Sequence, residues 1–344
     1  MRTEKSVSRE FLFVLVPGFS LLALSGAIDV LRAANLESAD ADYQWQLLGE
    51  YDAVESSSGL AMACHPLPAL KGRQTRICNK VVVVCGGDTS RVDNDTTLPH
   101  WLTSLPQQGL LIGSISDAAF VVAQSGLFDK HRSTIHWKCI DAYRHQFPHL
   151  DTRVSILEMD GNRFSCAGGT ASLDLFLQFV LQDLGTEVVA RIADNYFHDK
   201  LRDSSISQNV SEAYRYAGRS RVLAEALRIM AQNLEQPLAV AEIARQAGTT
   251  HRSLDRLFGR YLSLSPGKYY RRLRLNRAAN LLLQTGLPIS EIAVASGFGS
   301  ASHFGLHFKD TFDLSPGQFR LQGLQAPRHQ QETFRKPSLL KPPD

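Results

Sequence analysis

The chain has 344 residues, 44% of them hydrophobic, and at about 100–200 residues per domain this length predicts two or three domains with buried cores. The net charge of +3 conceals an asymmetry, because residues 219–344 hold 18 Lys and Arg against 9 Asp and Glu, whereas residues 1–218 hold 19 against 25. A basic C-terminal third beside an acidic N-terminal part indicates nucleic-acid binding by the former and another task for the latter.

Simple patterns exclude two kinds of protein. The five cysteines form no Cys-x-x-Cys pair and show no accompanying histidine spacing, so we expect free thiols in a reducing cytoplasm and neither a metal site nor a cofactor. The only apolar run near the N-terminus, residues 11–16, is too short for a signal peptide or a membrane span. A soluble cytoplasmic protein without membrane contact is therefore expected.

The N-terminal part alternates apolar strands with helices. Strands are predicted over residues 11–16, 43–48, 81–84, 110–114, 153–157 and 163–166, and helices over 21–35, 98–107, 118–125 and 171–184. The continuous β-branched run at 81–84 is typical of a strand buried on both faces. Asp160-Gly161-Asn162 predicts a hairpin turn between the last two strands. This alternation predicts a doubly wound, flavodoxin-like α/β domain that binds ligands at the carboxyl ends of its strands.

The chain changes character after this domain. Residues 199–218 are polar and predict an interdomain linker. A helical apolar stripe then begins the C-terminal domain, at Val222, Leu223, Leu227, Met230 and Leu234. The last residues are rich in Pro, Gln and Lys and predict a disordered tail. The expected organisation is an N-terminal domain over 10–198, a linker over 199–218, an all-α domain over 219–322 and a tail over 323–344.

Residues 238–320 contain one motif twice. The first copy has Glu-Ile-Ala at 242–244, Gly248 and Ser-Pro-Gly at 265–267, and the second has the same at 291–293, Gly297 and 315–317. Each copy predicts a helix-turn-helix, because a short helix ends at a glycine, which adopts the positive backbone angle of the turn without steric strain. The helix that follows carries its apolar residues on one face, at Leu254, Leu257, Phe258 and Leu262, then Phe304, Phe308 and Phe312.

One long helix, residues 266–284, is predicted between the two copies. It would be about 28 Å long, and successive major grooves on one face of B-DNA recur about every 34 Å. One rigid spacer could therefore present two reading helices to two neighbouring grooves. The repeat resembles the AraC-type DNA-binding domain over about residues 219–320, including its Ser-Pro-x-x-(Tyr/Phe)-Arg ending at 315–320.

That resemblance implies which side chains face DNA. They are Thr250, Arg252, Asp255 and Arg256 in the first reading helix, and Ser300, Ser302, His303, Leu306 and Lys309 in the second. Arginine suits the O6/N7 edge of guanine, so Arg252 and Arg256 are expected to read bases, while Asp255 either accepts from a cytosine amino group or braces an arginine. Phosphate neutralisation, or a position in solvent, is expected for Arg271, Arg272, Arg274 and Lys309.

The N-terminal part resembles the DJ-1/PfpI (glutamine amidotransferase-like) fold, in the form fused to AraC-type domains in GlxA-like regulators. The motifs that carry the resemblance lie at residues 16–20, 85–87, 113–120, 134–137 and 167–171. Regulators of this kind respond to small nitrogenous metabolites such as amino acids or betaine-like compounds. The resemblance also implies a homodimer.

Enzymatic relatives place a cysteine nucleophile on the sharp strand-to-helix turn where this chain has Ser116, and His136 could act as a base. Such enzymes also direct an acidic residue at the nucleophile, and it has no secure counterpart here: the nearby positions are Ala23 and Asp29, and only Asp29 carries a carboxylate. In addition, the negative charge of Asp117 would repel a developing oxyanion. We therefore expect a catalytically inactive pocket. Its predicted ligand-binding residues are Phe19, Gly86, Gly87, Ser116, Asp117, His136 and Trp137, with backbone N–H groups of the elbow and of Gly168-Gly169 holding a carboxylate.

The function predicted from these features is a ligand-controlled, sequence-specific transcription regulator, expected to be an activator that works at promoter DNA with RNA polymerase. An alternative is an amidase or peptidase-like hydrolase that uses Ser116 and His136 and is tethered to DNA. A third possibility is an architectural DNA-binding protein whose N-terminal half only dimerises.

Overall fold

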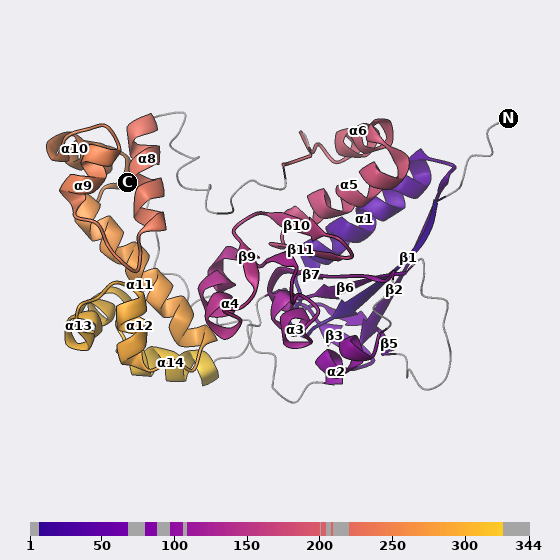
Figure 1. Cartoon of the computed structure of the whole chain (residues 1–344), viewed down its shortest axis with the longest axis horizontal. Coiled ribbons are helices and arrows are strands. Elements are labelled where there is room, and N and C mark those ends of the chain that lie inside the picture. Colours follow the sequence, from indigo (N-terminus) through magenta and orange to yellow (C-terminus); the bar gives the residue numbers. More distant parts are fainter. Residues whose placement is uncertain are drawn as a thin grey trace. The chain divides into compact units, whose positions relative to one another are not determined.

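A computed structural model describes residues 7–67, 80–87, 97–105, 109–199, 201–203, 208 and 220–325. The chain divides into two units, residues 1–208 and residues 209–344 (Figure 1). Within the described ranges, no helix is long and apolar enough to cross a membrane, and no group of three or more His, Cys, Asp or Glu side chains is placed to hold a metal ion.

A seven-stranded sheet forms the first unit, with strand order β10-β11-β7-β6-β1-β2-β5. Its strands are β1 (Val7–Leu15), β2 (Ala41–Gly49), β5 (His65–Pro66), β6 (Lys80–Cys85), β7 (Leu111–Ile115), β10 (Leu157–Asp160) and β11 (Arg163–Cys166). Every neighbouring pair is parallel except the β10–β11 hairpin. Two small separate pairings join β3 (Ala53–Glu55) to β4 (Ala61–Ala63) and β8 (Arg132–Thr134) to β9 (Asp151–Arg153).

Helices cover both faces of this sheet (Figure 1). One face packs against α1 (Leu21–Glu37), α5 (Ala171–Leu184) and α6 (Thr186–Asn195), and the other against α2 (Thr97–Ser104), α3 (Ala119–Gln124) and α4 (Ile140–Gln146). Short 3-10 turns, η1 (Ser116–Ala118) and η2 (Trp137–Cys139), precede α3 and α4. The predicted doubly wound α/β fold is confirmed.

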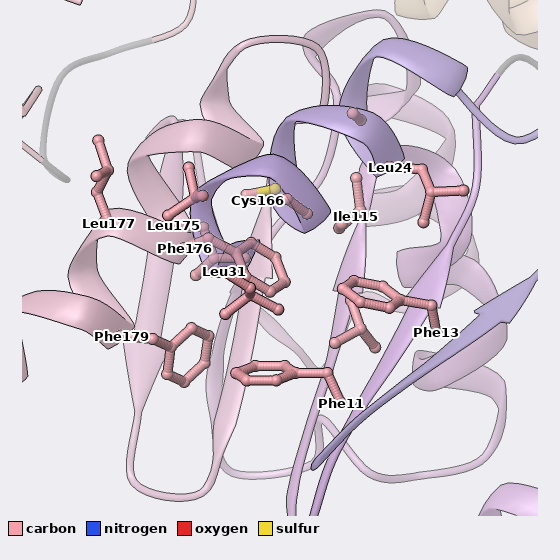
Figure 2. Close-up of a cluster of buried hydrophobic side chains, with 14 of the residues drawn as sticks. Phe11, Phe13, Leu24, Leu31, Ile115, Cys166, Leu175, Phe176, Leu177 and Phe179 are labelled. Atoms are coloured by element: carbon pink, nitrogen blue, oxygen red, sulfur yellow. The ribbon is translucent and has the colours of Figure 1, made fainter. Parts of the chain in front are cut away.

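The central strands are apolar throughout because both of their faces are buried. Phe11 and Phe13 of β1 belong to the core on the α1 side, whereas Leu12 and Val14 belong to the core on the other side. Residues 81–84 of β6 alternate in the same way. Figure 2 shows the two phenylalanines of β1 facing α5, where their rings meet those of Phe176 and Phe179.

The predicted strand at residues 153–157 is wrong. Residues 151–153 form β9, which pairs with β8, and the strand that pairs with β11 is β10, at residues 157–160. The hairpin turn places Asp160 opposite Arg163, so the register of β11 determines where its partner lies. The pattern at residues 153–157 spans the end of β9 and the start of β10. These two strands have different partners, and the partners become neighbours only in the folded chain.

The described part of the second unit is helical. Its helices are α8 (Arg221–Gln232), α9 (Val240–Gln246), α10 (His251–Leu262), α11 (Pro266–Gln284), α12 (Ile289–Ala295), α13 (Ala301–Phe312) and α14 (Pro316–Gln325). The turns between α9 and α10 and between α12 and α13 contain Gly248 and Gly297, with φ of 72° and 74°. Both predicted helix-turn-helix motifs are confirmed, and α11 has the bounds predicted for the connecting helix. The predicted tail from residue 323 is wrong at its start, because α14 continues to Gln325; residues 326–344 lie outside the described residues.

Each helix-turn-helix has its own hydrophobic core. The first core is built by α8, α9, α10 and the first turns of α11, including Tyr269 and Tyr270. The second is built by the remainder of α11 from Leu275 onward together with α12, α13 and α14. We call these two parts of the unit the first half and the second half.

Candidate functional site

The reading helix of the first half, α10, is held by its apolar face and exposes the predicted DNA-contacting residues. Leu254 and Phe258 are fully buried, whereas Arg252 and Arg256 are exposed on the opposite side. Thr250 caps the helix, because its hydroxyl oxygen accepts from the Ser253 N–H at 3.2 Å. The two arginines predicted to read bases are therefore presented to solvent on a capped helix.

Asp255 has a partner within α10. Its carboxylate lies 3.1 Å from Nδ1 of His251, one turn earlier. This contact is an ion pair when the histidine is protonated, and the two roles expected of Asp255 at DNA stay predictions. His251 was not among the predicted site residues, although its i, i+4 spacing from Asp255 is the signal for such a pair.

In the second half, α13 exposes a chemically milder surface. Ser300 caps the helix by accepting from the His303 N–H at 3.2 Å, and Leu306 is 69% exposed. Ser302 and Lys309 are exposed as predicted. The exposed apolar side chain of Leu306 suits contact with the methyl group of thymine. The residues assigned to DNA by resemblance therefore lie on the outer faces of both reading helices, and their contacts with bases remain a prediction.

His307, which the sequence analysis missed, extends this surface. Its Nε2 atom lies 3.0 Å from Nε2 of His303, one turn earlier on α13. Burial lowers the pKa of His307, and the positive charges of Arg271 and His303 lower it further. A groove of about 340 Å³ is lined by Lys268, Arg271 and Arg272 of α11 and by His307 and Asp310 of α13, so the positive charge lies on its α11 side.

The interpretation of Arg274 as a phosphate contact or a solvated side chain is wrong. Its guanidinium lies 5.5 Å from the Tyr270 ring and 4.7 Å from the Phe298 ring, and Nη1 donates to the carbonyl oxygen of Gly297 at 2.8 Å. Burial lowers its pKa. The residue is an internal contact, and its type alone could not distinguish it from its exposed neighbours.

In the first unit, four of the predicted pocket residues converge at the carboxyl end of the sheet. Ser116 has a φ of 61°, the strained backbone of a sharp strand-to-helix elbow, and its hydroxyl donates to the Gly87 carbonyl at 3.3 Å. The Asp117 carboxylate passes over Gly86 so closely that a Cβ there would lie 2.2 Å from Oδ1. Ser116 and Asp117 are both buried. The glycine at 86 is therefore required by the approach of the acidic side chain.

Cys166, expected from the sequence only to be a free thiol, lies on β11 beside the last residue of β7 (Figure 2). It pairs in register with Ile115, the residue before Ser116. Burial raises the pKa of its thiol to about 12, and hydrogen bonds from the backbone N–H groups of Gly168 and Ser116 oppose that rise. Two of the N–H groups expected to hold a ligand carboxylate are therefore directed at sulfur.

The aromatic residues predicted for the pocket have different positions. Phe19 is fully buried in the core on the α1 side, so its ring is a core residue, and only its backbone pairs with Gly87. Trp137 is 46% exposed, and Nζ of Lys138 lies 5.9 Å from the centre of its ring. Nδ1 of His136 accepts from the Lys138 N–H at 3.3 Å. A cationic ligand at Trp137 would thus compete with a lysine.

The candidate acid for catalysis is turned to the outside. Asp29 pairs with Arg32 one turn later on α1 at 3.2 Å, and its side chain is 50% exposed. Ala23 is buried and has no ionisable group. Neither residue therefore supplies Ser116 with the carboxylate partner that a hydrolase of this type would need.

Two residues of the predicted linker are bound to the first unit. Arg202 donates from Nε to the fully buried carboxylate of Asp174 at 2.9 Å and from Nη2 to the Thr170 hydroxyl at 3.0 Å. Nε2 of Gln208 donates to the Ile135 carbonyl at 2.8 Å, next to His136. The chain that leaves this unit is therefore tied beside the elbow and beside a predicted ligand-binding residue.

Known transcription regulators are similar to this chain over both of its units. The helix-turn-helix domain family matches residues 243–322. The HTH-type transcriptional regulator CdhR of Pseudomonas aeruginosa is 34% identical over 93% of this chain and 94% of its own length. The regulator GlxA of Rhizobium meliloti is 36% identical over 90% of this chain and 94% of its own length. A solved AraC family transcriptional regulator from Pseudomonas putida is 23% identical over 55% of this chain and 99% of its own, with a TM-score of 0.49.

Similarity at this level over nearly the full length of both relatives shows the family. This chain belongs to the GlxA-like HTH-type transcriptional regulators.

Proposed function

We propose that this DNA-binding transcription regulator is controlled by a small nitrogenous metabolite, an amino acid or betaine-like compound, that binds at the Ser116 elbow. The observation that carries the proposal is the convergence of Ser116, Asp117, Gly86 and Gly87 at the carboxyl ends of the strands, where α/β folds bind ligands. Transcription activation, a homodimer, contact with RNA polymerase and a cytoplasmic location are proposed with it, from the family resemblance.

The chemistry of the elbow favours a ligand with a positive charge. Asp117 places a buried carboxylate at the elbow. Trp137, the residue after His136, presents a half-exposed aromatic ring. Charge pairing and cation–π attraction both favour an amine or a quaternary ammonium group. Because Lys138 already lies over the Trp137 ring, displacement of that lysine is part of the proposed binding step.

The same contacts support a binding role in preference to catalysis. The Ser116 hydroxyl donates to the Gly87 carbonyl, which holds its proton away from a base. His136 accepts a backbone N–H through Nδ1, and Asp29 faces outward. A nucleophilic serine requires a base within hydrogen-bond reach and donors for an oxyanion, and here the Ser116 and Gly168 N–H groups bind sulfur.

Ligand binding is tested by thermal unfolding of the full-length protein with amino acids, betaines and simple amines. A ligand at about 100 times its Kd adds about 2.7 kcal/mol, which raises Tm by roughly 5–10 °C for a unit of this size. Asp117→Asn should abolish the shift. Asp151→Asn, a change in an exposed carboxylate, should preserve it. The sensor proposal fails if no compound of these classes shifts Tm, or if the shift survives in Asp117→Asn.

The hydrolase alternative is tested separately, by turnover of amides and peptides. We expect no turnover by the wild-type protein. An activity that disappears in Ser116→Ala would support the enzyme and contradict the proposed sensor.

A further inference from the structure

We propose that Arg274 and Gly297 form a joint that sets the separation and rotation of the two reading helices, and hence the spacing of the two DNA boxes that this protein accepts. This inference rests on the proposed reading of DNA by α10 and α13. It assigns positioning roles to two residues that lie outside the set expected to contact DNA.

The need for a joint follows from the two separate cores. Among the described helices, only α11 contributes to both, through Tyr270 to the first and Leu275 to the second. A continuous helix limits the distance between the halves, but each half packs on a different part of it. Their relative rotation therefore depends on what bridges the halves around residues 270–275.

Arg274 is such a bridge. Its guanidinium lies between the ring of Tyr270, which belongs to the first core, and the ring of Phe298, which belongs to the second. Nη1 also donates to the carbonyl of Gly297, in the turn of the second helix-turn-helix. One side chain thus contacts both halves and holds the turn from which α13 begins.

The loop between α8 and α9 completes the contact. The Tyr270 hydroxyl is hydrogen-bonded to the Asn233 carbonyl and accepts from the Leu238 N–H, so it secures both ends of this loop. Between those ends, the loop packs directly on Gly297: a Cβ there would lie 2.6 Å from the Leu234 carbonyl oxygen and 2.9 Å from Cδ of Pro237. The first half therefore leaves no room for a methyl group on the turn of the second half.

Gly248 occupies the same place in the first helix-turn-helix and provides a matched comparison. Its φ of 72° is nearly that of Gly297, at 74°, yet a Cβ on Gly248 would meet nothing within 4 Å. Alanine at either position carries the same strain of a left-handed backbone. Only at Gly297 does it also push the two halves apart.

A joint of this kind determines which DNA spacing fits. One inserted base pair moves the second box by about 3.4 Å and turns it by about 34°. A rigid pair of reading helices cannot follow that change, so the wild-type protein should lose affinity for the altered duplex. A protein with a loosened joint should lose less.

The experiment uses the full-length protein and a duplex enriched by it from a random-sequence library. One base pair is inserted between the two boxes, and the ratio of the two Kd values is measured for the wild type, Gly297→Ala, Arg274→Met and Gly248→Ala. We expect a ratio of at least about tenfold in the wild type and in Gly248→Ala, but less than about threefold in Gly297→Ala and Arg274→Met. Partial unfolding lowers the active fraction for both duplexes alike and leaves the ratio unchanged.

Equal ratios in all four proteins, or a wild type indifferent to the insertion, would overturn the joint. Failure of the underlying assignment of the reading helices has a different signature, because Arg256→Ala would then bind the enriched duplex like the wild type. The two failures are therefore distinguishable with the same duplexes.

Discussion

The two helix-turn-helix halves have the same framework and expose different chemistry. Leu254 and Phe258 hold α10 on its core, as Phe304 and Phe308 hold α13, and all four are fully buried. On the outer faces, α10 presents three arginines, at 252, 256 and 260, whereas α13 presents serines, a histidine pair and Leu306. The buried residues of a duplicated motif preserve its geometry, while the exposed ones are free to differ in the DNA they recognise.

The turns differ as well. Gly248 meets open space, while Gly297 packs against the loop of the other half. In the first half, the turn before the reading helix does not contact the other half. In the second half, the turn before the reading helix packs on the first half and so orients that helix. This difference leads us to expect that the first half contributes most of the base discrimination and the second half most of the geometric constraint.

The largest expected effect comes from breaking one core at a time. Phe308→Ala should destabilise the second half by about 3–5 kcal/mol, because it removes a fully buried aromatic side chain. Hydrogen exchange should accelerate in α12–α14 more than in α8–α10, since the cores are separate. Leu321→Ala, which truncates an exposed side chain, should change stability by less than about 0.5 kcal/mol. Equal acceleration in both halves would show one cooperative unit.

A change in base reading should follow next in size. Arg256→Ala should weaken binding to the enriched duplex by about 1–3 kcal/mol and relax base preference at one position. Arg260→Ala is the matched control, because this arginine lies on the same helix with its guanidinium 5.4 Å from the Tyr261 ring. Selection of binding sites from a random library measures the base preference of both variants, and the control should keep the preference of the wild type. Unchanged selection by Arg256→Ala would remove the assignment of α10 as the first reading helix.

A smaller and purely electrostatic effect is expected in the second half. Lys309→Ala should reduce the slope of log K against log salt by about one unit, because one phosphate contact is lost. Base preference should stay as in the wild type. Titration of the enriched duplex at several salt concentrations provides the slope, and a loss of base preference without a change in slope would contradict a phosphate contact.

The smallest effect concerns pH. The pKa of His307 is lowered from its ordinary value of 6.5, first by burial and then by the charges of Arg271 and His303. Asp310 opposes this and Arg274 adds to it. The unfolded chain therefore takes up a proton before the folded one, so stability of the second half should be constant above pH 6.5 and fall as pH drops below it. Urea unfolding at several pH values should show a flatter profile for His307→Gln; an unchanged profile would exclude His307 as the source.

Much of the second unit could be predicted from local patterns. Proline in its first turn, a capping serine and the Gly-Leu-Pro that follows determine α11, whose predicted and observed bounds agree. The first unit was harder at its edges. Residues 153–157 looked like one strand, but the pairing partners of β9 and β10 are set by segments distant in sequence. Helices α4 and α6 were missed for lack of a clear signal at their ends.

The sequence by itself determined the two-unit organisation, the alternation of the sheet, the duplicated motif and the family, because periodicity, turn residues and motif order are properties of neighbouring residues. Only the tertiary structure decided which side chains of one type face inward. Arg274 lies between two rings while Arg256 is exposed, and Phe19 lies in the core while Trp137 does not. The physical reason is that burial, hydrogen bonding and close approach depend on segments that meet only when the chain folds.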